Sequence, residues 1–575
     1  MAIVASSRRT ATCGPTWAFL PWHDDHPDRL DLDRQLPRDH LARQIDAAVD
    51  HLDLASLDAL YHGTGSLPFD PKVLLRAVLY EVRNGQHSPA QWHDHAHYLT
   101  PVRWLLRGYQ PSRSCWYAFR DRIAPLLLRL NGQPLRLAVA EQLTPATRGA
   151  GDGTAVAANA SRHRLLNEAN LHKRVQQLDL VIAADEAAVA GGAAAAELAA
   201  ALPENSVAPA DGVPGTSAAA ATMVAGTAVA AAAAAATVAP LAVPAATVPA
   251  ACTAPAAVAA AVPGWMAKRP ASRKAQRQRL HKAQQHLAQR QARNHAKVRS
   301  KQTAPERLVI SATDPEAALG LDKDKVFRPL YNVQVVDDLD SPFILGYEVF
   351  AQPNDAGLLG TLVQRVQTLT GRALQTLLTD GGYVGGADLR AAAEAGVNVY
   401  APLPQEDAQA KQLPKSAFTW LPQEQTYRCP QGHLLHLEGT GPRRRSGPDS
   451  VVVQRFRCPP EHCQSCPLQA RCAKRPASGR TVSRSEYEPE IEALRQRMDS
   501  PEAKTLYRLR KQTVELVNAD WKGHRQLRRF SGRGLARVRC QVGLIVLAHN
   551  LLTLLTEEKK TGATKLTLSP TDIAT

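Results

Sequence analysis

A long stretch without charge sets the strongest limit on how this chain can fold. No Asp, Glu, Lys or Arg occurs between Asp211 and Lys268, and the run is mostly Ala with Val, Thr and Pro. Proline at positions 240, 244, 249 and 255 interrupts any long helix, and a run so poor in Leu, Ile and Phe inserts weakly into a membrane. We therefore expect a low-complexity linker rather than a membrane span, and a folded core assembled from the residues on both sides.

Length and charge narrow the classes of protein further. With 575 residues the chain is too long for one core, so roughly two to four domains are expected. The net charge of +16 and the pI of about 9.5 suit an anionic partner, with nucleic acid first; a soluble protein that is merely basic is the alternative. The N-terminal residues 1–9 lack the apolar stretch of a secretion signal, so we expect a cytoplasmic protein with reduced cysteines.

Apolar periodicity predicts a helical domain over residues 38–145, after a disordered tail over 1–37. Leu41, Ile45 and Val49 recur at a spacing of four, and a second helix is expected after Pro71. A third surrounds Trp116 and continues through a kink toward residue 130. A dimerisation or scaffold bundle is one interpretation of this domain.

The pattern changes to strands and helices after residue 145. A strand begins at Asp152, and others are expected at 331–336, 343–350, 374–379 and 397–401, with helices at 356–369 and 387–395. This order predicts a mixed α/β core, built from residues 146–162, 321–402 and 491–556. It is interrupted by an insertion over 163–320, which holds a helix, the Ala-rich linker and a basic helix, and by a Cys-rich insertion over 403–490. Residues 557–575 are expected to form a disordered tail.

Three acidic residues stand where such a core can bring them together. Asp152 lies in Gly-Asp-Gly-Thr, Asp380 closes an apolar strand, and Glu515 lies in a later helical segment. Three converging carboxylates can hold two divalent metals and cut a phosphodiester. Each Asp alone is also a common residue at the end of a strand.

The ordered set of motifs resembles the DDE transposases of bacterial insertion sequences, over roughly residues 38 to 556. The motifs that carry the resemblance are Asp152-Gly-Thr with Asn159-Ala-Ser161, Asn354-Asp355, Asp380-Gly-Gly-Tyr383, Thr513-Val-Glu515 with Lys522, Arg528-Arg-Phe530, Arg533-Gly-Leu535, Val538-Arg539 and Leu547 to Leu552.

The resemblance implies a ribonuclease-H-like mixed sheet and a chemistry. Asp152, Asp380 and Glu515 would hold two Mg²⁺ per active site, and residues 38–145 would help bind the ends of the element. The partners would be double-stranded DNA, as terminal inverted repeats and as target, and a second copy of the chain in the DNA complex, near the nucleoid of a bacterium. The alternatives are a catalytically decayed DNA-binding relative and a nuclease of this fold without strand transfer.

The surroundings of Glu515 depart from the family pattern of Tyr, two residues, Arg, three residues, Glu. Tyr507 and Arg510 lie one residue too early, so that Lys511 occupies the position of the Arg. Asn518-Ala519 replaces the usual Phe-Gly. Glu502 is the alternative third carboxylate.

The Cys-rich insertion predicts a structural zinc site. Cys463 and Cys466 have the spacing of a zinc knuckle, and Cys429-Pro-x-Gly resembles a tight thiolate turn. With Cys472 these residues resemble the cysteine pattern of such insertions in the family. Cys458 and three histidines, His433, His436 and His462, compete for the site, and unliganded thiols are the alternative.

Two basic segments predict contacts with DNA. The segment 268–301 carries twelve Lys or Arg and no acid, with Leu280 and Leu287 as its main apolar residues; the alternative is a solvated tract. The second segment follows Glu515 and precedes an apolar run over 542–555, where His549 and Asn550 are expected to serve packing and hydrogen bonding. The candidate DNA-binding residues are Arg273, Lys274, Arg277, Lys522, Arg525, Arg528, Arg529 and Arg533.

Overall fold

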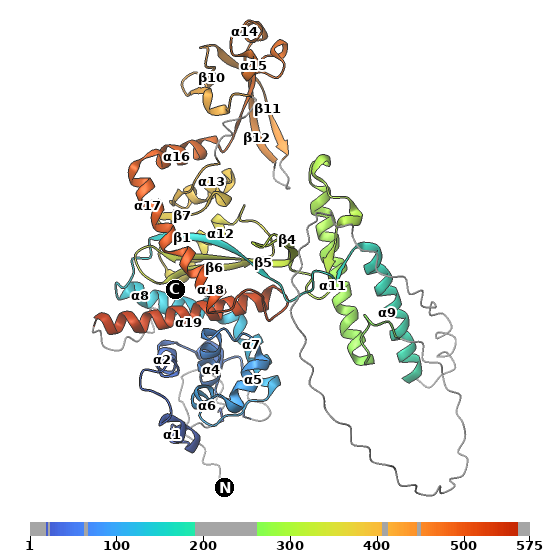
Figure 1. The fold of residues 1–575 in the computed structure, drawn as a ribbon, viewed down its shortest axis with the longest axis vertical. Helices are drawn as coiled ribbons and strands as arrows, with labels where there is room; N and C mark the ends of the chain where they lie inside the picture. Colours follow the sequence, from blue (N-terminus) through green and yellow to red (C-terminus); the bar gives the residue numbers. More distant parts are fainter. Residues whose placement is uncertain are drawn as a thin grey trace, which may run out of the picture. The chain divides into compact units, whose positions relative to one another are not determined.

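The computed structural model describes residues 19–20, 24–61, 67–189, 262–404, 412–444 and 450–561 (Figure 1). The Ala-rich linker predicted from the sequence lies outside these residues, as does most of each predicted tail. The described chain divides into two units, residues 172–278 and the rest, and each is taken by itself below.

The N-terminal part is helical, as predicted. Its described α-helices are α1 (Pro27–Asp33), α2 (Leu41–Ala48), α3 (Ala55–Asp58), α4 (Pro71–Arg83), α5 (Pro89–Tyr98), α6 (Thr100–Leu106), α7 (Arg113–Ile123) and α8 (Leu127–Ala140). Helix α4 begins at Pro71 because the proline ring fixes the backbone of the first turn and Asp70 caps it. The Asp70 carboxylate accepts a hydrogen bond from the amide of Lys72 at 2.8 Å. A short 3-10 turn at Ala124–Leu126 separates α7 from α8, which confirms the expected kink.

The prediction that residues 1–37 form a disordered tail is wrong from Pro27 onward. Helix α1 is part of the bundle, because the Leu32 and Leu36 side chains are buried in its core. The Arg29 guanidinium also lies 3.0 Å from the Asp46 carboxylate on α2. Acidic and Pro-rich composition concealed these two anchors.

A mixed six-stranded sheet follows the helices. Its strands are β1 (Arg148–Ala157), β4 (Ala318–Leu321), β5 (Phe327–Asp338), β6 (Ile344–Phe350), β7 (Thr376–Leu378) and β8 (Asn398–Tyr400). The order is β4-β5-β1-β7-β8, and β6 also pairs with β5. Strand β1 is antiparallel to β5 and parallel to β7, and β7 is parallel to β8. Each strand expected from the sequence is present, which confirms a mixed α/β core.

Along the chain, α12 (Leu359–Thr370) follows β6 and α13 (Gly386–Glu394) follows β7. Helix α12 begins three residues later than predicted. The sequence predicted that this helix starts at residue 356, next to Asn354-Asp355. Instead, the Asp388 carboxylate accepts hydrogen bonds from the amides of Gly357 at 2.8 Å and Leu359 at 3.2 Å. The cap therefore comes from the next helix, which leaves Asp355 available to the sheet.

The C-terminal helices are α16 (Glu488–Asp499), α17 (Pro501–Gln512), α18 (Val514–Gly523) and α19 (Leu535–Thr561), so α19 extends into the tail predicted from residue 557. Helix α19 is long and apolar enough to cross a membrane, but 72% of its apolar window is buried. Asn550 bonds both the amide and the carbonyl of Ile344 on β6, and His549 bonds the Pro342 carbonyl at 2.8 Å. This confirms their packing role. One continuous hydrophobic core joins the N-terminal helices, the sheet and α19.

The first insertion contains β2 (Leu165–Leu166), β3 (Ile310–Ser311) and two helices, α9 (Glu168–Val189) and α11 (Pro270–His295). Within residues 172–278 three ion pairs join the helices: Arg273 to Asp185 at 2.6 Å, Lys274 to Glu186 at 2.8 Å, and Arg277 to Asp179 at 3.6 Å. The basic helix predicted from the sequence is thus present as α11, and acidic residues of α9 form ion pairs with three of its basic residues.

The Cys-rich insertion folds around a five-stranded antiparallel sheet in the order β13-β12-β11-β10-β9. Its elements are β9 (Thr419–Leu421), β10 (Thr426–Arg428), β11 (Leu434–Arg444), β12 (Ser450–Arg457), α14 (Pro460–Gln464), α15 (Gln469–Cys472) and β13 (Thr481–Ser485). It has its own small core, in which Phe418, Tyr427 and Phe456 pack beside three cysteines.

Candidate active site and nucleic-acid surface

The site is centred on Asp152, in the middle of β1. Asp152 pairs with Val335 of β5 in the sheet register, and helix α18 packs over the same strand. One oxygen of its carboxylate accepts a hydrogen bond from Arg510 at 2.9 Å, and the other accepts one from the Asn518 amide at 2.7 Å. Burial raises the pKa of Asp152, while the charges of Arg510 and Lys323 lower it. The carboxylate is therefore half-buried and held in one orientation.

Asp380 follows β7, the parallel neighbour of β1. Its carboxylate caps the turn Gly381–Tyr383 by accepting a hydrogen bond from the amide of Gly382 at 2.8 Å. Asp380 lies close enough to Asp152 for its charge to contribute to the raised pKa of that residue. Asp152 lies two residues beyond the part of β1 that pairs with β7, and Asp380 lies two residues beyond the end of β7. The parallel register of these strands thus brings two of the three predicted carboxylates together.

Glu515 enters from the first turn of α18. Its side chain is 49% exposed and lies 3.6 Å from the Arg510 guanidinium, which also holds Asp152. Tyr507 is a neighbour of all three carboxylates: burial is the main cause of its raised pKa, and the charges of Asp380, Asp152 and Glu515 add to it. The alternative, Glu502, is exposed and precedes Arg510 by eight residues on α17, which is about 12 Å of helix.

The one-residue offset of Tyr507 and Arg510 has a structural explanation. Helix α17 ends at Gln512 and α18 starts at Val514, and Thr513 between them has φ −111° and ψ −91°, outside the helical region. This break takes up the extra residue. Arg510, and not Lys511, reaches the carboxylates, and Lys511 is exposed. The prediction that Lys511 occupies the position of the Arg is therefore wrong in space.

Asn518 also gains a role that the sequence did not reveal. The residue departs from the usual Phe of the pattern, and it lies one turn after Glu515 on α18. Its buried side chain donates to Asp152, so the departure orients the carboxylate.

Two further acids adjoin the site. Asp355 accepts hydrogen bonds from Asn332 at 2.8 Å and Gln334 at 2.6 Å on β5. Asp337 follows the strand expected over 331–336, and β5 continues through it to Asp338. Burial raises its pKa well above the usual range, and the charge of Asp152 adds to the effect. Asp337 has no signal in the sequence, because the sheet places it, whereas Asp355 belongs to the Asn354-Asp355 motif and meets β5 from a loop.

The carboxylate oxygens are the donors that Mg²⁺ prefers, so the residue types fit such an ion. Within the part of the chain that the structure describes, no group of three or more His, Cys, Asp or Glu side chains is arranged to hold a metal. At Asp152, Arg510 and Asn518 engage both carboxylate oxygens.

The cysteines of the second insertion gather around one small cavity. Cys429, Cys463, Cys466 and Cys472 line it, as does their competitor Cys458, together with His433 and His462. Gly432 has φ +86° and its amide donates to the Cys429 carbonyl at 2.9 Å, which confirms a tight turn there. Backbone amides of Arg480 and Leu468 donate to the sulfurs of Cys463 and Cys466, each at 3.4 Å.

The basic segment after Glu515 divides into surface and interior. Arg528, Arg529 and Arg533 are exposed, and each donates to a backbone carbonyl, of Lys522, Ala160 and Asn159 respectively. Lys522 is half-buried near Asp152 and Lys323. The prediction that Arg525 binds DNA is wrong, because its side chain is buried. It donates hydrogen bonds to Asp520 at 2.9 Å and to the Arg83 carbonyl at 2.8 Å, so it joins two parts of the core.

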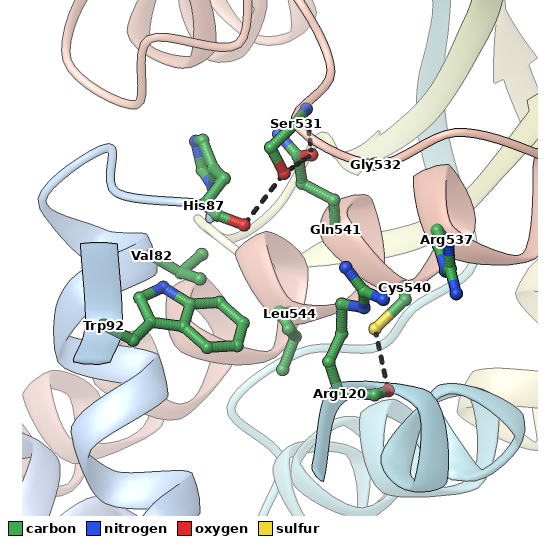
Figure 2. A pocket seen from close by; sticks show the side chains of 10 residues that line it. All are labelled: Val82, His87, Trp92, Arg120, Ser531, Gly532, Arg537, Cys540, Gln541 and Leu544. Atoms are coloured by element: carbon green, nitrogen blue, oxygen red, sulfur yellow. Dashed lines mark hydrogen bonds between the residues drawn. The ribbon is translucent and has the colours of Figure 1, made fainter. Parts of the chain in front are cut away.

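A small cavity shows how this segment is anchored (Figure 2). His87 accepts into its carbonyl a hydrogen bond from the Ser531 hydroxyl at 2.9 Å, and its ring bonds the Arg525 carbonyl at 2.6 Å. Gln541 on α19 holds the same serine hydroxyl at 3.0 Å. The N-terminal helices thus fix the loop that presents Arg528 to Arg533.

Among the predicted DNA-binding residues on α11, the prediction for Arg273 is also wrong. Arg273 is 6% exposed and lies 2.6 Å from the Asp185 carboxylate. Lys274 and Arg277 are paired with acids on α9 but remain more exposed. The sequence hid these pairs because the acids lie about 90 residues earlier, beyond the Ala-rich linker.

Comparison with known proteins gives two matches. The family described as Transposase DDE domain matches residues 428–555, which include Glu515 and Lys522. The family described as Transposase domain (DUF772) matches residues 30–122, which cover most of the N-terminal helices. No curated protein and no solved structure matches the chain.

Proposed function

We propose, on the premise that this chain is a DDE-type insertion-sequence transposase, that it binds the terminal inverted repeats of its element and catalyses strand cleavage and strand transfer. The observation that carries the proposal is the convergence on Asp152. Glu515 from a covering helix shares Arg510 with it, and Asp380, which follows a parallel strand, lies with both acids around Tyr507, although the three acids are far apart in sequence. The strand order β6-β5-β1-β7-β8 further supports a ribonuclease-H-like core.

The roles of the residues follow from their positions. Asp152, Asp380 and Glu515 would hold two Mg²⁺, which activate the attacking oxygen and neutralise the leaving oxygen. Asn518 keeps the Asp152 carboxylate oriented, and the carbonyl of Thr379 fixes the Tyr507 hydroxyl at 3.0 Å. Lys522, Arg528, Arg529 and Arg533 would bind phosphates close by. A water would free a 3′-hydroxyl at each end, and that hydroxyl would then attack target DNA.

Charge-neutral variants test the catalytic set. We expect Asp152→Asn, Asp380→Asn and Glu515→Gln each to lower Mg²⁺-dependent cleavage of end-bearing DNA by roughly 10³-fold, because each removes stabilisation of charge in the transition state. Binding of the same DNA in gel shifts should persist. Glu502→Gln is the matched control, since Glu502 is exposed on the preceding helix, and it should cut at the parental rate.

Each other result selects an alternative. Normal cleavage by Glu515→Gln would mean that the third ligand lies elsewhere. DNA binding without any cleavage by the parent protein would favour a decayed relative. Cleavage without joining to target DNA would favour a nuclease. Two copies of the chain on one pair of ends, seen in the mass of the complex, would support a dimeric assembly.

We also propose a structural zinc ion at the cysteine cavity, with Cys429, Cys463, Cys466 and Cys472 as ligands. The gathering of these residues from three segments around one cavity supports it. Elemental analysis of protein purified without added metal should give about one zinc per chain, lost in Cys466→Ser. Cys115→Ser, in the N-terminal helices, is the control and should keep its zinc. Folded protein without zinc would contradict the proposal. Loss of zinc in Cys458→Ser would mean that Cys458 is a ligand in place of one of the four.

A further inference from the structure

The turn between β4 and β5 is a rigid hairpin with an unusual tip. The Asp322 carboxylate accepts hydrogen bonds from the amides of Asp324 and Val326, both at 2.9 Å, and lies 2.7 Å from Arg328. Lys325 adopts φ +57°, which closes the turn. These bonds stay within the hairpin, so they leave the side chains of Lys323 and Lys325 exposed.

The base of the hairpin is tied to the loop that carries Asp355. A Cβ atom placed on Gly320 would lie 2.6 Å from the Cβ of Pro353, which is closer than real side chains approach. The strand therefore packs directly on that loop. Two residues further along the loop, Asp355 reaches the sheet beside Gly153 and Gly382. The hairpin thus has a fixed base on the side of the sheet where the catalytic strands end.

The hairpin also lies beside the segment that follows α18. At the base of the hairpin the Pro329 carbonyl accepts a hydrogen bond from the Ala158 amide at 3.0 Å. The adjacent Ala157 bonds the backbone of Arg528 and Phe530, which follow α18. The charges of Lys323 and Asp324 also act on Lys522, near the end of that helix. Lys323 is thus a cation on this side of the sheet to which the proposed function gives no role.

Two apolar side chains flank this lysine without cover. Leu321 is 63% exposed and Phe327 is 50% exposed, and they are directly paired across the hairpin. Directly opposed side chains on such strands touch. Two side chains form a surface far below the roughly 800 Å² per partner of a stable protein interface, but their size suits one nucleobase. The charge of the neighbouring Lys323 favours a polyanion as the occupant.

We propose that three residues of this hairpin hold DNA at the cleavage site, with the Lys323 ammonium on a backbone phosphate and Leu321 and Phe327 against an unpaired base of the same strand. The proposal rests on the proposed function for its substrate. It gives the hairpin the task of opening the end of the duplex and of keeping one strand beside Asp152. Enzymes that act on an extruded base stack it on such side chains.

The test of the phosphate contact compares two lysines of one turn. Lys323→Ala should make the slope of log affinity against log salt concentration shallower by about 0.7 to 0.9, and it should slow cleavage roughly tenfold or more. Lys325→Ala should keep the parental slope and a cleavage rate within about twofold of the parent. Lys323→Arg should restore most of the rate. Thermal melts check that each variant is folded. Equal effects of the two Ala variants would overturn the contact.

The base contact is read with 2-aminopurine at each of the last nucleotides of the end. We expect one position to be quenched in the complex, and the quench to be lost in Phe327→Ala but kept in Val298→Ala, another exposed apolar residue. Unchanged quenching in Phe327→Ala would overturn this part, as would a change in self-association without DNA. If the parent protein binds DNA but never cuts it, the proposed function fails, while the salt slope and the quench still decide the hairpin.

Discussion

Two basic segments that look alike in the sequence differ in the folded protein. Residues 268–301 hold twelve Lys or Arg without an acid, yet at least four of them, Arg273, Lys274, Arg277 and Lys282, pair with carboxylates from other segments. In the C-terminal segment Arg528, Arg529 and Arg533 bond backbone carbonyls, and no carboxylate of the described residues forms an ion pair with them. A carbonyl orients a guanidinium and leaves its charge in place, whereas a carboxylate cancels it.

The difference shows that a count of local charge does not identify a DNA surface. What matters is whether acids distant in sequence return to the segment. The acids nearest to the C-terminal segment bond the start of the next helix and form no ion pair with its three arginines in the described residues. The amides of Gly534 and Leu535, at the start of α19, donate to Asp314 and Glu316. These acids therefore serve the helix terminus and do not neutralise the arginines.

The largest expected effect comes from the C-terminal arginines. We predict that replacing Arg528, Arg529 and Arg533 together with Ala lowers DNA affinity roughly 100-fold at moderate salt and makes the salt slope shallower by about 2 to 3, since each lost phosphate contact releases fewer counterions. A salt titration measured by anisotropy checks both values. The matched control is Arg537→Ala with Arg539→Ala, because these residues pair with Asp121 and Glu348.

A second prediction concerns stability in the first insertion. Arg273→Ala leaves the Asp185 carboxylate without its main partner in a largely covered position, so we expect the pairing of α9 and α11 to lose roughly 2 kcal/mol. Lys274→Ala removes an exposed pair and should cost under about 1 kcal/mol. Hydrogen exchange over both helices measures the difference. If Arg273→Ala instead changes the salt slope of DNA binding and leaves exchange unaltered, the contrast between the two segments is lost.

The smallest expected effect is on pH dependence. Burial lowers the pKa of His87 to about 4, and the Arg525 carbonyl, which accepts from the ring, opposes this shift. The folded state then binds fewer protons than the unfolded state between pH 6.5 and 4. The free energy of unfolding should fall as the pH drops toward and through this window, by roughly 0.7 kcal/mol from pH 7 to pH 6, and His87 should contribute almost nothing above about pH 7.5.

Urea titrations at each pH measure this slope. His87→Gln retains a hydrogen-bond donor but does not titrate, so its stability should vary less over the same range. If DNA binding weakens in parallel with this local loss in the parent protein, the anchor between the N-terminal helices and the arginine loop contributes to the basic surface. An identical pH profile for parent and variant would contradict the role of His87.

The sequence by itself determined the elements and the candidate chemistry. The spacing of apolar residues and the positions of Gly and Pro predicted the N-terminal helices, the strands β1, β5, β6, β7 and β8 and the buried α19, because these signals depend on residues a few positions apart. The motifs around Asp152, Asp380 and Glu515 predicted the candidate chemistry through their resemblance to DDE transposases.

Tertiary structure decided which polar side chains meet. The break at Thr513 places Arg510 on Asp152, the sheet register buries Asp337, and α9 supplies the acid that covers Arg273. The β4–β5 hairpin likewise gains its meaning only from the neighbours of Lys323. A hydrogen bond or an ion pair reports distances of about 3 Å between atoms, and no pattern along a chain encodes those when the partners are hundreds of residues apart.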